Sequence, residues 1–218
     1  MTKNLSERIL TSFFLLSILF TCIFINKYLF LALLIVSSFI SFNEFNRLIK
    51  KSFKKEINFI ATVQIFSALF FILYTYTSYE IYGRSPIVII WIIAICIFSD
   101  TGGYVIGKLV GGKKLTKISP NKTIAGSVGS FIFSLIPLIF LSLTNEIYND
   151  INLAQLVIVS LLLSLICQAG DLLISYFKRK AKVKDTGSIL PGHGGLLDRI
   201  DGLIFVLPAA YFIDKIIF

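Results

Sequence analysis

The sequence predicts an all-α, polytopic membrane helix bundle, because its composition, its apolar stretches and its basic loops all favour that class. Of the 218 residues, 56% are hydrophobic and 15% are charged, whereas a soluble domain carries about 25% charged residues. The mean hydropathy of +0.85 also excludes a disordered chain, since disorder requires low hydrophobicity. The composition therefore favours an integral membrane protein over a cytosolic globular domain.

Seven apolar stretches are candidates for transmembrane helices, each of which needs about 20 mostly apolar residues. They cover residues 9–25, 28–42, 57–79, 86–107, 125–143, 151–177 and 196–218. The second stretch is short, so a re-entrant or interfacial element is an alternative for it. Basic residues precede the first stretch and no small-residue cleavage site follows it, which favours an uncleaved signal anchor.

The distribution of Lys and Arg predicts the orientation of these spans. With the N-terminus in the cytoplasm, 18 of the 21 Lys and Arg residues fall in cytoplasmic segments, as the positive-inside rule requires. The net charge of +9 then reflects topology, and nucleic acid is not an expected partner. We expect a multi-pass protein of the cell (inner) membrane, with the lipid bilayer as its surroundings. The basic segment 43–56 is expected to be a loop or an interfacial helix held by anionic headgroups.

We expect two parts in the chain: N-terminal membrane helices, residues 1–85, and a catalytic membrane domain, residues 86–218, which contains two predicted cytoplasmic loops. The loops cover residues 99–123 and 170–201, and they contain most of the glycines, five acidic residues and the single His. A loop that only connects two helices needs none of these residue types. We therefore expect the chemistry of the protein in these two loops, on the cytoplasmic face.

Acidic residues lie near the predicted cytoplasmic ends of the spans, at Asp100, Asp171, Asp198 and Asp201. An ionised carboxylate at membrane depth costs at least about 2.5 kcal/mol, so it usually has a partner or an ion. Asp198 and Asp201 share one face if their segment is helical. Oxygen ligands without a Cys or His cluster favour Mg²⁺. The alternatives are carboxylates that reach the interface, and ion pairs with Arg199 and nearby lysines.

Two segments precede spans that enter from the cytoplasm, at residues 119–123 and 191–195. Ser, Asn and Thr in the first are typical helix N-caps, and unsatisfied N–H groups at such an end favour phosphate. Four basic residues add positive charge: Lys178, Arg179, Lys184 and Arg199. Acids for a divalent cation, helix N-termini and cations together indicate polyphosphate chemistry at the membrane surface.

The glycines of residues 102–108 approach the spacing of a P-loop, but Leu109 stands where the magnesium-binding Ser or Thr belongs. The segment is also apolar and lies in a predicted span. We expect Gly103 and Gly107 to pack against another helix instead.

One dense motif fills the second loop. It reads Ser175-x-Phe177-Lys178-Arg179, then Lys184-Asp185-x-Gly187, then Leu190-Pro191-x-His193-Gly194-Gly195-Leu196-x-Asp198-Arg199-Ile200-Asp201. This motif closely resembles the signature of the phosphatidate cytidylyltransferases (CDP-diacylglycerol synthases). Asp100-x-Gly102-x-Tyr104 and Ser119-Pro120-Asn121-Lys122-Thr123 resemble two further blocks of that family. Lys182 departs from the pattern, since the family usually has Gly there, and Gly103 stands where Ala is common.

The resemblance implies a nucleotidyltransferase of phospholipid biosynthesis, which makes CDP-diacylglycerol and pyrophosphate from CTP and phosphatidate. It implies that Asp171, Asp198 and Asp201 bind Mg²⁺, with K⁺ as a possible second cation, and that the protein forms a homodimer. Catalytic roles fall on Asp171, Asp198, Lys184 and Asp185. Substrate-binding roles fall on Ser119, Asn121, Lys122, Thr123, Lys178, Arg179, His193, Arg199 and Asp100.

Two other functions remain open at this point. The cytosolic motif also fits a CTP-dependent enzyme that acts on another lipid. An ion-coupled transporter would use Asp100 and Asp171 as a cation pathway, although the sequence lacks the paired, interrupted spans of inverted repeats.

Overall fold

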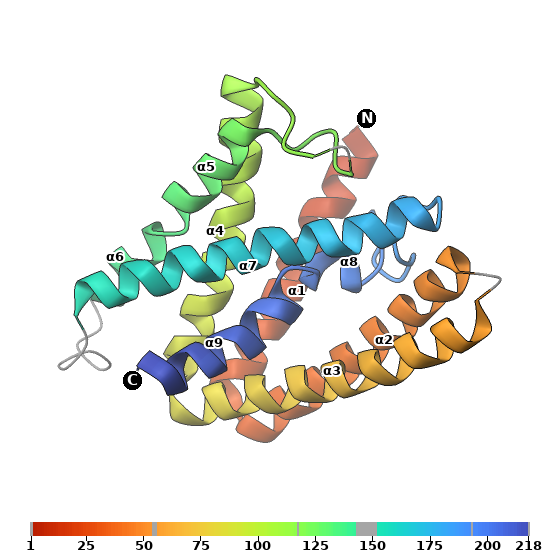
Figure 1. Ribbon diagram of the computed structural model, residues 1–218. Helices are drawn as coiled ribbons and strands as arrows, with labels where there is room; N and C mark the ends of the chain where they lie inside the picture. The colour runs from red at the N-terminus through yellow and green to blue at the C-terminus, as the bar shows by residue number, and fades with distance from the viewer. Residues whose placement is uncertain (1, 54–55, 117, 143–151, 193, 218) are drawn as a thin grey trace. The chain divides into compact units, whose positions relative to one another are not determined.

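The computed structural model describes residues 2–53, 56–116, 118–142, 152–192 and 194–217. Within these residues the chain is helical, with two isolated β-bridges and no strand. In chain order the helices (Figure 1) are α1 (Thr2–Ile25), α2 (Lys27–Ser52), α3 (Ile57–Arg84), α4 (Pro86–Val110), α5 (Ile124–Phe133), α6 (Ile136–Ser142), α7 (Leu153–Lys180), α8 (Leu197–Ile200) and α9 (Leu203–Ile217). The all-α prediction is therefore confirmed.

Four helices in the described part of the chain are long and apolar enough to cross a membrane: α2, α3, α4 and α7. Two shorter apolar stretches, Leu10–Ile25 and Ile124–Phe140, accompany them. Helices of this length and composition are typical of a multi-pass membrane protein. The predicted seven spans and the cytoplasmic N-terminus stay predictions.

The second predicted span is longer than its apolar stretch. Helix α2 has 26 residues and ends at Ser52, so it runs through most of the basic segment 43–56. Lys, Arg and Glu are good helix formers, and the helix continues where hydropathy ends. Within this extension Glu44, Leu48 and Ile49 are buried. The prediction that residues 43–56 form a separate loop or interfacial helix is therefore wrong for residues 43–52.

Two predicted spans are each divided by a short break. The stretch 125–143 separates into α5 and α6 at Ser134 and Leu135, and Pro137, which has no N–H to donate, follows in the first turn of α6. The stretch 196–218 separates into α8 and α9 at a turn that contains Gly202. A Cβ atom on Gly202 would lie 2.5 Å from the Sγ of Cys167, so glycine permits a close approach to α7.

The chain forms two compact units. The first comprises the residues up to Pro86 together with Phe177–Asp201, and the second comprises Ile87–Tyr176 together with the residues from Gly202 onward. In the first unit α2 packs along α3 and against α1 (Figure 1), and the hydroxyls of Ser38 and Thr75 meet at 2.6 Å between α2 and α3.

In the second unit α4 and α5 pack closely through glycines. A Cβ atom on Gly102 would lie 2.5 Å from the Cβ of Phe133, and one on Gly129 would lie 2.5 Å from the Cβ of Ile106. Gly103 and Gly107 also face α5, where a Cβ atom would meet Ser130 and Thr123. The predicted packing role of Gly103 and Gly107 is confirmed, and the contact holds the start of α5 beside α4.

Candidate active site

The signature loop of the first unit begins with a tight turn at the end of α7. The N–H of Lys182 donates to the carbonyl of Arg179, and the N–H of Val183 donates to the carbonyl of Lys178, both at 3.0 Å. This pair of bonds is a Schellman motif, which places its turn residue in the left-handed region. Lys182 has a φ of +55° and is the one non-glycine residue with positive φ among those the structure describes. The geometry explains why Gly is the expected residue there.

The carboxylate of Asp198 is the centre of this loop. Its Oδ2 accepts hydrogen bonds from the N–H of Thr186 at 2.7 Å, the N–H of Gly195 at 3.0 Å and the hydroxyl of Thr186 at 3.0 Å. Its Oδ1 accepts from the Nζ of Lys178 at 2.9 Å, and the side chain is 4% exposed. Burial raises the pKa of Asp198, but Lys178 and the two backbone N–H groups lower it more, so the pKa lies below its ordinary value.

Lys178 contacts both Asp198 and Asp201. Its Nζ lies 2.9 Å from Asp198 and 3.9 Å from the Oδ2 of Asp201. The expectation that both acids share one face is confirmed, and the alternative of an ion pair with a lysine also describes the structure. An ammonium group between two carboxylates occupies a position that suits a cation with oxygen ligands.

A polar cavity of about 630 Å³ borders the same loop. Lys184, Asp185 and Arg199 line it, together with the backbone of a turn in which Leu190 and Gly194 exchange hydrogen bonds at 2.9 and 3.1 Å. Gly194 has a φ of +86°, which a non-glycine residue rarely adopts. The structure thus brings three of the predicted residues to one cavity, while Arg179 is exposed on the last turn of α7. The predicted residue His193 lies outside the described residues.

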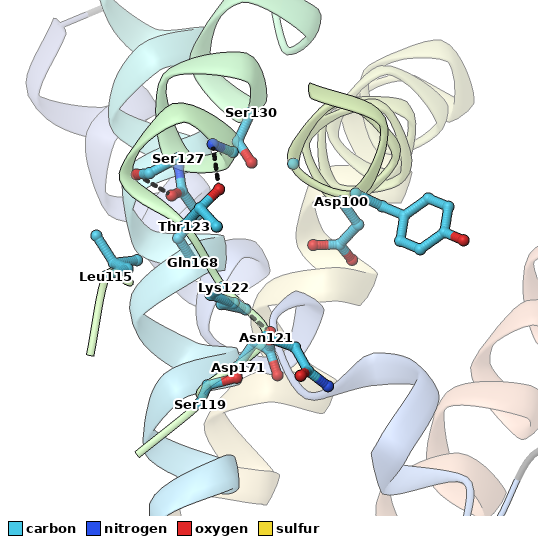
Figure 2. A pocket seen from close by; sticks show the side chains of 13 residues that line it. Asp100, Leu115, Ser119, Asn121, Lys122, Thr123, Ser127, Ser130, Gln168 and Asp171 are labelled. Atoms are coloured by element: carbon cyan, nitrogen blue, oxygen red, sulfur yellow. Dashed lines mark hydrogen bonds and ion pairs between the residues drawn. The ribbon is translucent and has the colours of Figure 1, made fainter. Parts of the chain in front are cut away.

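A second pocket, of about 310 Å³, belongs to the second unit (Figure 2). Its lining includes six residues to which the sequence analysis gave site roles: Asp100, Ser119, Asn121, Lys122, Thr123 and Asp171. Figure 2 shows Asp100 on α4 across the pocket from Lys122, which forms an ion pair with Asp171 on α7. Residues from three separate parts of the sequence therefore meet at this pocket.

The segment before α5 is held by backbone and capping bonds. The N–H of Leu115 donates to the carbonyl of Lys122 at 2.8 Å, and the N–H of Ile124 donates to the carbonyl of Lys113 at 3.0 Å. Thr123 is the N-cap of α5, since its Oγ1 accepts from the N–H of Gly126 at 3.0 Å. These bonds fix the backbone that presents the Lys122 side chain, and they confirm the predicted cap.

A polar chain that starts in the lining of this pocket was not predicted. The hydroxyl of Ser127 donates to the Oε1 of Gln168 at 2.6 Å, and the Nε2 of Gln168 donates to Ser164 at 3.4 Å. Ser164 in turn meets Ser99 at 2.9 Å. The chain links α5, α7 and α4 at the level of Asp171, which is one turn from Gln168. Single Ser and Gln residues in apolar stretches carry no motif that would have revealed it.

The three predicted metal ligands are divided between the units, with Asp171 in the second and the other two in the first. Each of them contacts a lysine ammonium group, Lys122 for Asp171 and Lys178 for Asp198 and Asp201. Among the described residues no group of three or more His, Cys, Asp or Glu side chains is gathered as a metal site. The metal assignment therefore stays a prediction, although carboxylates that each hold a cation are chemically suited to Mg²⁺.

Sequence reasoning missed Glu44. This α2 residue is 1% exposed, and its carboxylate accepts hydrogen bonds from the N–H groups of Leu196 and Leu197 and from the hydroxyl of Thr186. The available signal was an acid near the start of the basic segment 43–56, which is not specific enough to indicate a role.

Comparison with known proteins identifies relatives of this chain. A model of the cytidylyltransferase family matches residues 55–217. Three bacterial proteins named phosphatidate cytidylyltransferase are similar to parts of the chain. The Bacillus subtilis protein is 37% identical over 173 residues, 76% of this chain and 61% of that protein. The Staphylococcus aureus protein is 48% identical over 131 residues, 60% of this chain and 50% of that protein.

The third relative, from Staphylococcus saprophyticus, is 52% identical over 114 residues, which are 50% of this chain and 42% of that protein. The chain thus spans about half the length of the curated relatives it matches. The family match includes both the pocket at Asp171 and the loop around Asp198.

Proposed function

The chain belongs to the cytidylyltransferase family, and on that premise we propose that it transfers the cytidylyl group of CTP to phosphatidate, giving CDP-diacylglycerol and pyrophosphate. The observation that carries the proposal is the family match over residues 55–217, because it spans every acidic and basic residue that we assign below. The names of the three relatives support the choice of phosphatidate as the acceptor lipid.

In this reaction a phosphate oxygen of phosphatidate attacks the α-phosphorus of CTP, and pyrophosphate leaves as the bond to the β-phosphate breaks. The charge on the phosphate oxygens requires fixed cations, which act best in a site that excludes water. Lys184 and Arg199 face one polar cavity, and Lys122 lines the other. We assign these cations, with Lys178 and Arg179, to the phosphate groups of the two substrates.

The acidic residues have a complementary role. We assign Asp171, Asp198 and Asp201 to a Mg²⁺ ion, which can be accompanied by K⁺. When bound, Mg²⁺ neutralises phosphate charge during an in-line displacement. The paired lysines support this assignment, since carboxylates that hold an ammonium group can exchange it for another cation and leave the lysine to bind phosphate. Asp185 completes the catalytic set beside Lys184 and Arg199.

The remaining substrate contacts are assigned to the second pocket. Ser119, Asn121 and Thr123 present polar groups beside Lys122, and Asp100 lies across from them. His193 is assigned to the substrate from the motif alone. We further propose a bacterial cell membrane as the location, a cytoplasmic active site that receives CTP from the cytosol, and a homodimer embedded in the bilayer.

A cytidylyl-transfer assay tests the proposal. The full chain is purified in detergent and incubated with phosphatidate, Mg²⁺ and CTP labelled at its α-phosphate, and the lipid is extracted and counted. We expect labelled lipid from the wild-type protein, and none from Asp198→Asn or in the presence of EDTA. Glu80→Gln, which changes an exposed acid on α3, is the matched control and should remain active.

Two results would contradict the proposal in different ways. Failure to label any of several phosphatidates, while the protein still binds CTP, would indicate another acceptor lipid. Failure to bind CTP at all would exclude nucleotide chemistry and favour an ion-coupled transporter.

A further inference from the structure

We propose that Glu44 is a positioning residue, which holds the loop 186–197 so that Asp198 keeps its place in the active site. Glu44 lies on α2, outside the residues 55–217 that match the family model. The effect on the loop stands by itself, whereas the effect on catalysis rests on the proposed function.

The first argument is the burial of the Glu44 carboxylate and its set of donors. The residue is 1% exposed. Its Oε1 accepts from the N–H of Leu196 at 3.2 Å, and its Oε2 accepts from the N–H of Leu197 at 2.8 Å. A buried carboxylate is stable only where hydrogen bonds replace its lost hydration. Conversely, these two N–H groups, of which that of Leu197 is buried, depend on Glu44, because unpaired backbone donors are rare in folded proteins.

The second argument is a direct link from Glu44 to Asp198 through one hydroxyl group. The Oγ1 of Thr186 lies 3.1 Å from the Oε2 of Glu44 and 3.0 Å from the Oδ2 of Asp198. A hydroxyl has one proton, so it donates to one of these carboxylates at a time. Thr186 also donates its backbone N–H to Asp198 at 2.7 Å. A shift of Thr186 away from Glu44 would therefore move two of the donors that hold Asp198.

The third argument comes from two glycines of the signature. A Cβ atom on Gly187 would lie 2.5 Å from the Oε1 of Glu44, and one on Gly195 would lie 2.5 Å from its Oε2. Real Cβ contacts are never this short, so the backbone at both positions closes around the Glu44 carboxylate. Gly195 also donates its N–H to Asp198 at 3.0 Å. The loop is thus shaped to fit Glu44 on one side and Asp198 on the other.

The role is one of positioning, since in the described part of the chain the partners of Glu44 are loop groups and both cavities are lined by other residues. Displacement of a catalytic group by about 1 Å can lower a rate about a hundredfold. We therefore expect Glu44→Gln to lower kcat by about a hundredfold and to leave the KM for CTP nearly unchanged. A residue that only stabilised the fold would lower the amount of active protein and the melting temperature together, at unchanged kcat per folded molecule.

Amide hydrogen exchange of the purified chain, without substrate, tests the structural part. The amide nitrogen of Gln cannot accept a bond from Leu196 or Leu197, so Glu44→Gln should increase exchange in peptides that cover residues 184–199. Peptides from α3 should exchange as in the wild type. Glu80→Gln, the exposed control on the neighbouring helix, should change neither region. Unchanged protection of residues 184–199 in Glu44→Gln would overturn the proposal.

Further variants keep the test decisive if Glu44→Gln is recovered poorly. Glu44→Asp keeps the carboxylate and should restore part of the protection that Glu44→Ala removes. Thr186→Val keeps the side-chain size but removes the shared hydroxyl, and should loosen the same peptides by a smaller factor. Gly187→Ala should loosen the loop in the wild type and add much less in the Glu44→Ala background, where the 2.5 Å clash with the carboxylate is gone and the 3.3 Å contact with the Cα of Gly195 remains. Additive effects of Gly187→Ala and Glu44→Ala would overturn the proposal.

The two hypotheses fail in distinguishable ways. A wild-type protein that makes no CDP-diacylglycerol, with a loop that still loosens in Glu44→Gln, would contradict the proposed function and support the positioning role. An active wild type with full activity and full protection in Glu44→Gln would contradict the positioning role alone.

Discussion

The two acidic regions of the molecule are built differently. Asp198 is buried, with 4% of its side chain exposed, and two of its four hydrogen bonds come from backbone N–H groups. Asp171 is 24% exposed in its side chain, and its partners include the side chains of Lys122 and Ser175. A buried acid with backbone donors is part of the loop's fold, whereas a partly exposed acid that pairs with a lysine side chain can exchange that partner while the backbone stays in place. We therefore call the loop around Asp198 the frame, because backbone hydrogen bonds help to hold its acid in place. We call the pocket at Asp171 the surface, because its side chains can change partners.

The largest predicted effect is a difference in the free energy of unfolding when the same Asp→Asn substitution is made at Asp198 and at Asp171. Asn has the shape of Asp, but the amide nitrogen that replaces one carboxylate oxygen cannot accept hydrogen bonds. Asp198→Asn leaves buried donors unpaired and should lower the free energy of unfolding by about 3 kcal/mol. Asp171→Asn disturbs a partly exposed ion pair, and should lower it by less than about 1 kcal/mol. Both variants should lose cytidylyl transfer.

The measurement uses the three free cysteines, Cys22, Cys96 and Cys167, which are all buried. A thiol-reactive fluorophore labels them as the purified protein unfolds on heating, and so reports the melting temperature in detergent. Equal losses of stability in the two variants would contradict the contrast between frame and surface.

The second prediction concerns the helix contact on which the pocket at Asp171 is built. Gly129→Ala places a Cβ atom 2.5 Å from the Cβ of Ile106 and 2.8 Å from the carbonyl oxygen of Gly102. Overpacking of this kind costs about 1–3 kcal/mol, and we also expect loss of activity because Thr123, which lines the pocket, is the N-cap of α5. Gly83→Ala is the matched control, since beyond the backbone of its own helix no atom lies within 4 Å of the added methyl group. It should be neutral or raise the melting temperature slightly. Wild-type stability in Gly129→Ala would mean that α4 and α5 separate easily.

The sequence predicted the helices well and their ends less well. Hydropathy located the long apolar helices, because lipid exposure and burial both select apolar residues. It missed the extension of α2 to Ser52, since charged residues that favour a helix look like a loop on a hydropathy scale. It also missed the breaks at Ser134 and at Gly202, which depend on local backbone geometry.

The site shows the same division between local and long-range information. Motif residues of one loop, such as Lys178 and Asp198, carry a recognisable pattern, and their contact is the ion pair that the sequence offered as an alternative. Glu44 contacts Leu197 across 153 positions of sequence, and a single chain gives no signal for such a pair. Lys182 lies between these cases. The sequence shows that Lys replaces the usual Gly, and the structure shows, through the positive φ of this residue, why Gly is usual there.

A third prediction uses pH to test the frame around Asp198. The pKa of Asp198 is lower in the folded protein than its ordinary value of 3.8, because Lys178 and two backbone N–H groups stabilise the carboxylate. The folded loop then binds fewer protons than the unfolded chain between these two pKa values. Its stabilising contribution is complete above the ordinary pKa and is lost as the pH falls through the folded value.

In EDTA-containing buffer, the melting temperature of the wild type should therefore fall on acidification below about pH 4. Asp198→Asn lacks the titrating group and should show a weaker dependence over the same interval. Identical slopes for the two proteins would assign the acid sensitivity to other carboxylates.

The smallest predicted effect lies at the turn that leads into the frame. Lys182 adopts a φ of +55°, and a side chain in the left-handed region costs about 1–2 kcal/mol, part of which glycine loses again through its greater freedom in the unfolded chain. Lys182→Gly should therefore raise the free energy of unfolding by about 0.5–1 kcal/mol without changing kcat. Lys50→Gly, in the last turn of α2, makes the same chemical change in right-handed helix and should lower it by up to about 1 kcal/mol. The opposite signs of the two variants isolate backbone conformation from charge. A loss of stability in Lys182→Gly would mean that the lysine side chain supports the loop more than its backbone strains it.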